Sequence, residues 1–311
     1  MKLTETASGV FAIAPTPFCN DGAIDIASLD RLADFYAESG CAGITVLGIM
    51  GEAPKLEPHE ALDLATRVIK RAGNLQIVVG VSAPGFAAMR TLSRKVMDAG
   101  AAGVLIAPPA VLRTDDQIVN YFQQAIEAIG PDIPWVLQDY PLGVTVVMTP
   151  GVIRRIINDI PSCIMLKHED WPGLDKITAL RGFQQDGTMR PISILTGNGG
   201  LFLDFEMERG ANGAMTGYAF PDMLAEVVRL SKGGNRDAAH NLYDAHLPLI
   251  RYEQQMGIGL AVRKYVLKRR GILTSDAQRK PWPKLTPTAM HEIDYLLARV
   301  AQHDKRAALP N

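Results

Sequence analysis

Lys167 is the residue of this sequence best placed to do covalent chemistry. It ends the apolar run 163–166 and is followed by the polar stretch 168–170. Four apolar residues in a row are typical of a strand buried on both faces, as in a parallel sheet covered by helices. A lysine at the mouth of such a strand is poorly hydrated, which favours a neutral amine that can attack a carbonyl carbon. The alternative is a strand-end lysine whose stem covers apolar surface while its ammonium group reaches water.

Apolar runs and helical patterns alternate eight times along the chain. The runs predicted to be strands cover residues 10–14, 43–47, 77–81, 103–107, 135–138, 163–167, 192–196 and 213–216. The segments predicted to be helices lie near residues 26–39, 62–69, 87–98, 116–129, 150–158, beyond 173, 201–209 and 221–231. Eight strand-then-helix units predict a closed (β/α)8 barrel, the TIM barrel of the α/β class. A doubly wound sheet fits less well, because residues 14–18 lack a glycine-rich phosphate turn.

The remainder of the chain has a purely helical pattern. Apolar residues recur at helical spacing after residue 234, and Pro281 and Pro283 interrupt the pattern before a last helix near 290–301. We therefore expect residues 1–232 to form the barrel with the active site. We expect residues 233–311 to form a C-terminal helical extension packed on it.

Composition excludes several classes of protein. The formal net charge of the 311 residues is −1 and there is no basic cluster, which argues against a nucleic-acid partner. No apolar run is long enough to span a membrane, and the first residues lack the pattern of a secretory signal. Cys19, Cys41 and Cys163 are widely spaced, without the spacing of metal ligands. They are typical of free thiols in a reducing compartment, so we expect a cytoplasmic protein.

Polar residues and glycines follow the predicted strands at their carboxyl ends, where a barrel carries its active site. Glycine pairs such as Gly48/Gly51 and Gly197/Gly199 let backbone N–H groups approach a small anion. A nucleophilic amine beside such a turn suits a 2-oxo acid, whose carboxylate is anchored while its ketone is attacked. The candidate substrate-binding residues are Gly48, Met50, Gly51, Glu52, Gly197, Asn198, Met215 and Thr216.

These features together resemble the dihydrodipicolinate synthase/N-acetylneuraminate lyase family of class I aldolases over essentially the whole chain. The resemblance rests on the Gly48-x-x-Gly51-Glu52 turn, Pro141, Lys167, Gly197 and the Gly210-Ala211-Asn212-Gly213 turn. In that family the matching lysine forms a Schiff base and the Gly-x-x-Gly-Glu turn binds the substrate carboxylate. The resemblance also implies a homodimer or homotetramer.

The sequence departs from the synthase members of that family at several positions. Ile49 and Met50 stand where synthases have two threonines, and Gln138 stands where they have a catalytic tyrosine. Residues 110–112 replace a tyrosine lent across a subunit interface, and Gly143 replaces an arginine that grips a substrate carboxylate. The lysine chemistry is therefore kept while the synthase relay is lost, and we do not expect the protein to make dihydrodipicolinate.

The pattern is more similar to the branch of dehydratases that act on L-2-keto-3-deoxyarabonate. That branch shares the Gln138-Asp139 pair, the Lys167-His168-Glu169 segment, the stretch 210–217 and the segment 248–253, although the turn after the second strand differs. The implied reaction is dehydration of a 2-keto-3-deoxy sugar acid. The alternatives are a pyruvate-dependent aldolase or synthase, and a protein that binds a 2-oxo acid without consuming it.

The candidate catalytic residues are Lys167, Gln138, Tyr140 and Glu169. Lys167 would form the imine, and a carboxylate or phenol nearby would move the protons. Period-2 alternation would place Tyr140 and Gln138 on one face, so Tyr140 either replaces the displaced tyrosine or only caps the rim. Glu169 is either an acid/base or a helix cap or surface charge, and Glu52 is expected to brace its turn by accepting backbone N–H bonds. No metal or organic cofactor is implied, since no second His or Cys lies at ligand spacing from His168.

Overall fold

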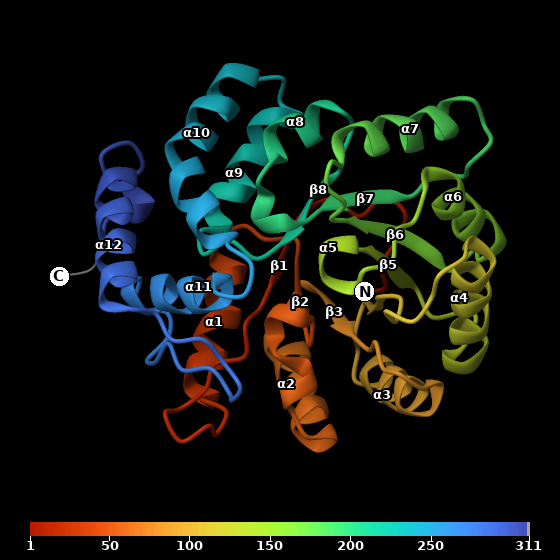
Figure 1. The fold of residues 1–311 in the computed structure, drawn as a ribbon, viewed down its shortest axis with the longest axis horizontal. Helices are drawn as coiled ribbons and strands as arrows, with labels where there is room; N and C mark the ends of the chain where they lie inside the picture. Colours follow the sequence, from red (N-terminus) through yellow and green to blue (C-terminus); the bar gives the residue numbers. More distant parts are fainter. Residues whose placement is uncertain (310–311) are drawn as a thin grey trace.

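Eight parallel strands pair in chain order, and the sheet closes because β1 pairs with both β2 and β8. This computed structural model describes residues 1–309 (Figure 1). The strands are β1 (Gly9–Ile13), β2 (Gly43–Val46), β3 (Gln76–Gly80), β4 (Gly103–Ile106), β5 (Trp135–Asp139), β6 (Cys163–His168), β7 (Ser193–Thr196) and β8 (Gly213–Thr216). The predicted TIM barrel is confirmed, and each predicted strand end lies within one residue of the observed one.

A helix follows each strand and covers the outside of the barrel (Figure 1). These helices are α1 (Ile26–Glu38), α2 (Pro58–Arg71), α3 (Phe86–Asp98), α4 (Asp115–Ile129), α6 (Pro150–Asp159), α7 (Leu174–Gln185), α8 (Leu203–Glu208) and α9 (Pro221–Lys232). The sequence did not predict the four-residue helix α5 (Pro141–Val144), which lies between β5 and α6. Short 3-10 turns are η1 (Ile49–Gly51), η2 (Ala53–Lys55), η3 (Asn198–Gly200) and η4 (Lys305–Ala307).

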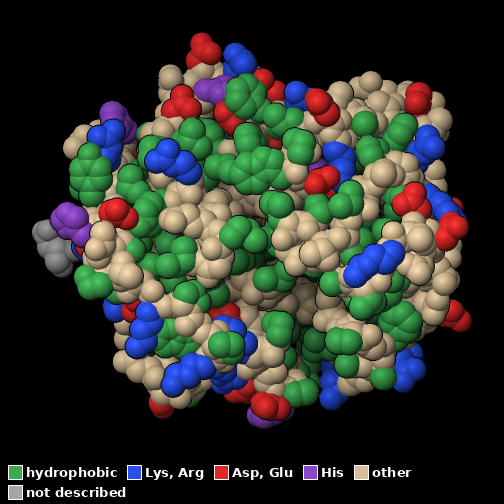
Figure 2. Space-filling model, in the orientation of Figure 1, with side chains coloured by type: hydrophobic (Ala, Val, Ile, Leu, Met, Phe, Trp, Pro, Cys, Tyr) green, Lys and Arg blue, Asp and Glu red, His purple; other side chains and the backbone are tan. Residues whose placement is uncertain are grey.

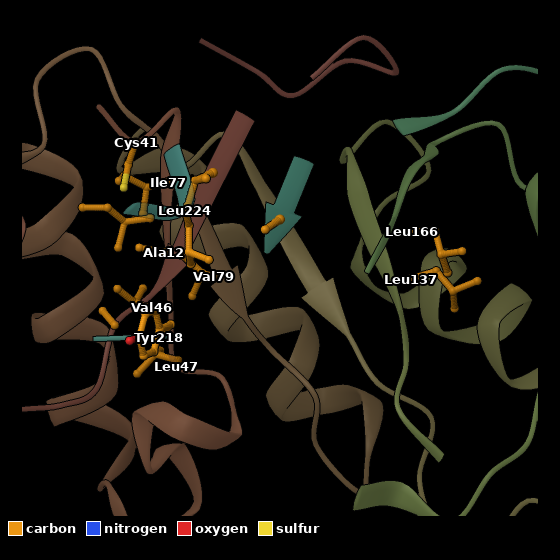
Figure 3. Packing of buried hydrophobic residues seen from close by; sticks show 14 of the residues in the cluster. Ala12, Cys41, Val46, Leu47, Ile77, Val79, Leu137, Leu166, Tyr218 and Leu224 are labelled. Carbon is orange, nitrogen blue, oxygen red and sulfur yellow. The ribbon is translucent and has the colours of Figure 1, made fainter. Parts of the chain in front are cut away.

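Alternating residues of each strand face two separate hydrophobic cores. Met165 belongs to the core inside the barrel, whereas Leu166 belongs to the core between the strands and the helices. Figure 3 shows Leu166 beside Leu137, its register partner on β5. Because successive strand residues point to opposite faces, Lys167 follows Met165 to the inside and His168 follows Leu166 to the outside. The strand pattern alone thus aims the lysine into the mouth of the barrel.

The C-terminal extension consists of α10 (Arg236–Glu253), α11 (Gly259–Arg269) and α12 (Pro287–Ala301). Helix α10 packs against both α9 and α12, and Figure 1 shows the three helices along one side of the barrel. Residues 310 and 311, the last two of the predicted extension, lie outside the described part. A hydrogen-bonded chain from Tyr218 through His246 to Asp304 ties the end of β8 to α10 and to the segment after α12.

Charges of both signs are interspersed around the edge of the face drawn in Figure 2, with apolar side chains gathered over its middle. This agrees with the formal net charge of −1. Mixed charges of this kind produce only a weak long-range field. Within residues 1–309, no helix has the length and apolar character needed to cross a membrane.

Arg279 connects the segment between α11 and α12 to the barrel helix α2. Its guanidinium donates two parallel hydrogen bonds to the Glu60 carboxylate, at 2.6 and 2.7 Å. Glu60 also accepts the backbone N–H of Glu57 at 2.9 Å, which completes the capping box of α2. Arg279 first, and then this backbone donor, lower the pKa of Glu60 from 4.5 to about 2.

We predict that Glu60→Gln lowers the free energy of unfolding at pH 7 by about 1 kcal/mol, because the pair is partly exposed. The folded-state pKa lies below the unfolded value, so the stabilisation is present above about pH 4.5 and is lost as the pH falls toward 2. Urea unfolding at several pH values should show the gap between wild type and variant closing in acid. Glu5→Gln, at an exposed site, serves as the control, and a gap that does not change with pH would contradict the assignment.

Candidate active site

A cavity of about 330 Å³ opens at the carboxyl ends of the strands. Seven candidate residues from the sequence line it: Lys167, Gln138, Tyr140, Glu169, Met50, Asn198 and Thr216. They come from the ends of five different strands or the turns that follow them. The closed barrel therefore brings together side chains that are up to 166 positions apart in the sequence, from Met50 to Thr216.

The centre of the cavity wall is a carboxylate shared by two neighbours. One oxygen of Glu169, Oε2, lies 3.0 Å from Nζ of Lys167 and accepts a 2.7 Å hydrogen bond from Nε2 of Gln138. Gln138 and Lys167 are register partners on β5 and β6, so both side chains point inward at the same level. All three side chains are buried. The arrangement fixes the position of the lysine nitrogen and provides a proton acceptor beside it.

The turn after β7 shapes the space that Glu169 occupies. A Cβ on Gly197 would lie 2.2 Å from Cγ of Glu169, so only glycine leaves room for this carboxylate. The next residue, Asn198, has a positive φ of 50° and donates a 2.9 Å hydrogen bond from Nδ2 to the backbone oxygen of Glu169. Gly197 itself does not line the cavity; it acts on the site through Glu169.

The residues between these inward side chains form a second polar layer outside the barrel. Asp139 is fully buried and its Oδ2 lies 2.8 Å from Nζ of Lys176 on α7 and 3.5 Å from Nδ1 of His168. Lys176 also pairs with Asp170 at 2.5 Å. The Gln-Asp and Lys-His-Glu segments thus send alternate residues to the cavity and to α7. In residues 1–309, no three His, Cys, Asp or Glu side chains are grouped to hold a metal ion.

Tyr140 reaches the same cavity as Gln138 by a different route from the predicted one. Strand β5 ends at Asp139, and Tyr140 occupies the N-terminal cap position of α5. Its ring packs on Gly143, where a Cβ would lie 2.1 Å from the ring carbon Cε1. Burial, and then the negative charge of Glu169, raise the pKa of Tyr140. The phenol therefore stays protonated at neutral pH and is available as a hydrogen-bond or proton donor.

Glu52 points away from the cavity into the C-terminal extension. Its carboxylate receives Nζ of Lys264 at 2.6 Å, Nζ of Lys55 at 2.9 Å and the backbone N–H of Arg279 at 3.1 Å. Burial lowers the pKa of Lys264 to about 8, and the attraction of Glu52 opposes that shift. Glu52 is held with a positive φ of 55°. This side chain ties the turn after β2 to the extension and does not line the cavity, so the candidate substrate-binding role of Glu52 does not fit its position.

Of the other residues in the turn after β2, some line the cavity and others only support the turn. Ile49 and Met50 line the cavity, whereas Gly48 and Gly51 do not. The backbone oxygen of Gly51 accepts a 2.6 Å hydrogen bond from the hydroxyl of Thr16, which ties the turn to the end of β1. Met215, another candidate from the sequence, belongs to the core inside the barrel. At its position on β8, the Met215 side chain lies inside the barrel and not in the cavity at its mouth.

The extension supplies a part of the cavity wall that was not predicted from the sequence. The lining residues from the end of α10, the connection to α11 and α11 itself are Glu253, Gln254, Gln255, Met256, Gly257, Gly259, Leu260 and Arg263. The residues 253–257 interrupt the apolar periodicity of the extension with a polar, glycine-containing run. The available signals were that interruption and the segment 248–253, shared with the dehydratase branch, which contains Glu253. The interruption marks a break between helices but does not indicate what the break faces.

A model of the dihydrodipicolinate synthetase family matches residues 6–300, which span the barrel and nearly all of the extension. The chain belongs to the dihydrodipicolinate synthetase family. It is accordingly a lyase of the class I aldolase and dehydratase type. The resemblance described from the sequence is confirmed.

The similar proteins are named either as dehydratases or as synthases. The chain is 29% identical to an L-2-keto-3-deoxyarabonate dehydratase from Azospirillum brasilense, over 92% of each chain. It is 28% identical to a 4-hydroxy-tetrahydrodipicolinate synthase from Laribacter hongkongensis, over 76% of this chain and 80% of that one. The crystal structure of a dihydrodipicolinate synthase from Rhodopseudomonas palustris matches with a TM-score of 0.95 and 72% identity, over 96% of this chain and 99% of that one.

We predict that Gly197→Ala destabilises the protein by roughly 1–3 kcal/mol, because the new methyl group would displace the Glu169 carboxylate from Lys167 and Gln138. Gly182→Ala in α7 is the matched control, since a Cβ there meets nothing within 4 Å and alanine favours the helix. Thermal unfolding should show a lower midpoint for the first variant and an unchanged or higher one for the second. Equal midpoints would show that Glu169 is not confined as described.

Proposed function

We propose that this lyase dehydrates a 2-keto-3-deoxy sugar acid of the L-2-keto-3-deoxyarabonate type through an imine on Lys167. The observation that carries the proposal is the buried cluster in which Glu169 is shared between Lys167 and Gln138. It places a primary amine and a proton acceptor 3.0 Å apart in the cavity at the mouth of the barrel. Support also comes from the dehydratase of Azospirillum brasilense, which is similar over 92% of the chain.

The first step joins the substrate to the lysine. Glu169 accepts a proton from the Lys167 ammonium, and the free amine attacks C2 of the 2-oxo acid. Loss of the C2 oxygen as water leaves a positively charged iminium. We place the C1 carboxylate at the turn after β2, because Ile49 and Met50 line the cavity and begin the short helix η1. The backbone N–H groups of a glycine-containing turn can approach a small anion closely.

The second step removes the hydroxyl at C4. The iminium withdraws electrons, so a C3 proton becomes acidic and its loss gives an enamine. The enamine electrons then expel the C4 hydroxyl, which takes up a proton and leaves as water. Hydrolysis of the iminium uses one water and regenerates the lysine, so one water is lost overall. For a five-carbon substrate, expulsion of the C4 hydroxyl leaves a C3=C4 double bond. Transfer of a proton from C5 to C3 converts it into a C4=C5 enol, whose tautomerisation gives a 2-oxo acid with an aldehyde at C5.

Two groups are suited to the proton transfers. Glu169 lies beside Lys167 and is the closest base to the carbon next to the imine. Tyr140 lines the cavity as a protonated phenol and serves as the acid that protonates the departing hydroxyl. The amide of Gln138 is not an acid or a base at neutral pH, and its hydrogen bond orients the Glu169 carboxylate.

The second candidate is the synthase reaction named for the structure from Rhodopseudomonas palustris, which is 72% identical to this chain. The cavity argues against it, because Ile49 and Met50 offer apolar side chains where synthases have two threonines. Gln138 likewise occupies the position of the synthase tyrosine. The two reactions separate by product, since the synthase consumes pyruvate with aspartate semialdehyde and the dehydratase consumes one sugar acid alone.

The oligomeric state and the cellular location are predictions that rest on the family resemblance and on the cysteines. We propose a homodimer or homotetramer in the cytoplasm, with a small 2-oxo acid as the binding partner of each subunit. The two buried cysteines support a reducing compartment, because Cys41 and Cys163 have no disulfide in the structure.

Borohydride trapping tests the nucleophile. With pyruvate or L-2-keto-3-deoxyarabonate present, we expect mass spectrometry to locate one reduced adduct on Lys167, and Lys167→Ala to abolish both the adduct and turnover. Lys268→Ala, at an exposed ion pair on α11, should keep both. An adduct on another lysine, or none in folded protein, would sink the proposal.

Tyr140→Phe tests the proton donor. We expect kcat for dehydration to fall by roughly 10²- to 10⁴-fold, the usual contribution of a positioned acid. The trapped imine with pyruvate should still form, because Lys167 and Glu169 are unchanged. Tyr295→Phe removes an exposed phenol and is the control. Unchanged turnover in Tyr140→Phe would contradict a role in proton transfer and would leave the tyrosine only a position at the rim of the barrel.

A further inference from the structure

Arg263 on α11 brings a buried guanidinium to the cavity with one nitrogen left over. Its side chain is 2% exposed, and Nε donates a 2.6 Å hydrogen bond to Oε1 of Glu253. Nη1 is buried and has no hydrogen-bond partner among residues 1–309. Arg263 and Glu253 both line the cavity that contains Lys167.

Gly217 is the reason that the guanidinium can lie where it does. A Cβ on this residue would be 1.8 Å from Nη1 of Arg263. The first residue after β8 therefore has no side chain, and the guanidinium covers the end of that strand. A buried donor without a hydrogen-bond partner lowers the stability of the folded protein, so such groups are rare and often have a functional reason. Because Arg263 lines the cavity, an oxygen atom of a bound molecule is a suitable partner for this donor.

The position of this donor relative to the lysine matches a short carbon chain. Lys167 is on β6 and Gly217 follows β8, with β7 between them in the barrel wall. Neighbouring strands are about 4.8 Å apart, so the two strand ends are separated by roughly 10 Å. The side chain of Lys167 covers part of this separation, and a five-carbon acid held by an imine at C2 carries its C5 hydroxyl about 5 Å further, over four bonds.

The charge of the site favours a hydroxyl at that far end. Glu253 and Arg263 form a pair with no net charge, and Glu253 is fully buried with its second oxygen 3.3 Å from the backbone N–H of Ala219. A hydroxyl can accept a hydrogen bond from Nη1 and donate one to the carboxylate of Glu253. A carboxylate at the same place would add a second negative charge beside Glu253 in a poorly hydrated site, which is unfavourable.

We propose that Glu253 and Arg263 form a distal subsite that binds the terminal hydroxyl of the substrate and selects against sugar acids with a carboxylate at both ends. This inference rests on the proposed dehydration at Lys167 and adds the substrate class that the cavity accepts. Arg263 thus determines specificity through the end of the substrate remote from the reacting carbons.

The test pairs two substrates with two proteins. L-2-keto-3-deoxyarabonate has a hydroxyl at C5, and 4-hydroxy-2-oxopentanoate is the same chain without it. We expect the wild type to prefer the first by roughly 10- to 100-fold in kcat/KM, the effect of a hydrogen bond to a charged group. In Arg263→Gln this preference should largely disappear. The control Arg269→Gln removes a different arginine of α11, which pairs with Asp294 and does not line the cavity, and should keep the preference.

If Arg263 has only a structural role, its replacement changes kcat/KM for the two substrates in a different way. If Arg263→Gln lowers kcat/KM for both substrates by the same factor, the subsite is refuted. Rapid consumption by the wild type of the analogue that ends in a second carboxylate would refute the charge selection. Should the single variant fail to fold because Glu253 is left unpaired, the double variant Glu253→Gln/Arg263→Gln keeps a neutral hydrogen-bonding pair and is measured instead.

The adduct on Lys167 separates this inference from the function on which it rests. Pyruvate has no carbon beyond C3, so its borohydride-trapped imine should form equally in wild type and Arg263→Gln. If neither protein forms the adduct, the proposed function fails. If both form it and both retain the same preference for the C5 hydroxyl, only the distal subsite fails.

Discussion

The Glu169 carboxylate, shared between Lys167 and Gln138, is the interaction on which the site depends. A buried charge is costly unless it is paired and hydrogen-bonded, so every neighbour of this group is constrained. The register of β5 with β6 sets the level of the two side chains. The missing side chain of Gly197 provides the space, and Asn198 holds the backbone behind the carboxylate. Changing any of these would leave a buried charge unsatisfied.

A second polar layer on the outer face of the same two strands supports this arrangement. Asp139 and His168 point outward between the inward residues, and Lys176 of α7 pairs with the aspartate. Replacing buried ion pairs with apolar residues is often neutral or stabilising, so pairs of this kind are weak evidence for stability. Their effect here is positional, because they hold α7 and the ends of β5 and β6 in a fixed relation. The inner carboxylate can then keep its geometry when a substrate enters.

The barrel was predictable because its signals are local. An apolar run with a helical pattern after it identifies each unit, and period 2 assigns Lys167 and Gln138 to the inside. The reach of Tyr140 was not predictable, since it depends on the turn into α5. Nor was the contribution of Arg263, because the sequence does not show how the break between α10 and α11 folds back over β8. Contacts that need two distant helices to be placed first have no local pattern.

The wall of the cavity is encoded in two widely separated parts of the gene, and this has a consequence during synthesis. The lysine and its partners at residues 138–169 leave the ribosome well before residues 253–263 exist. Domains emerge from their N-terminal end and begin to fold as they do so. A nascent barrel therefore lacks this wall of the cavity around Lys167 until α10 and the start of α11 have been made. Only then can Lys264 pair with Glu52 and hold the turn after β2 against the extension.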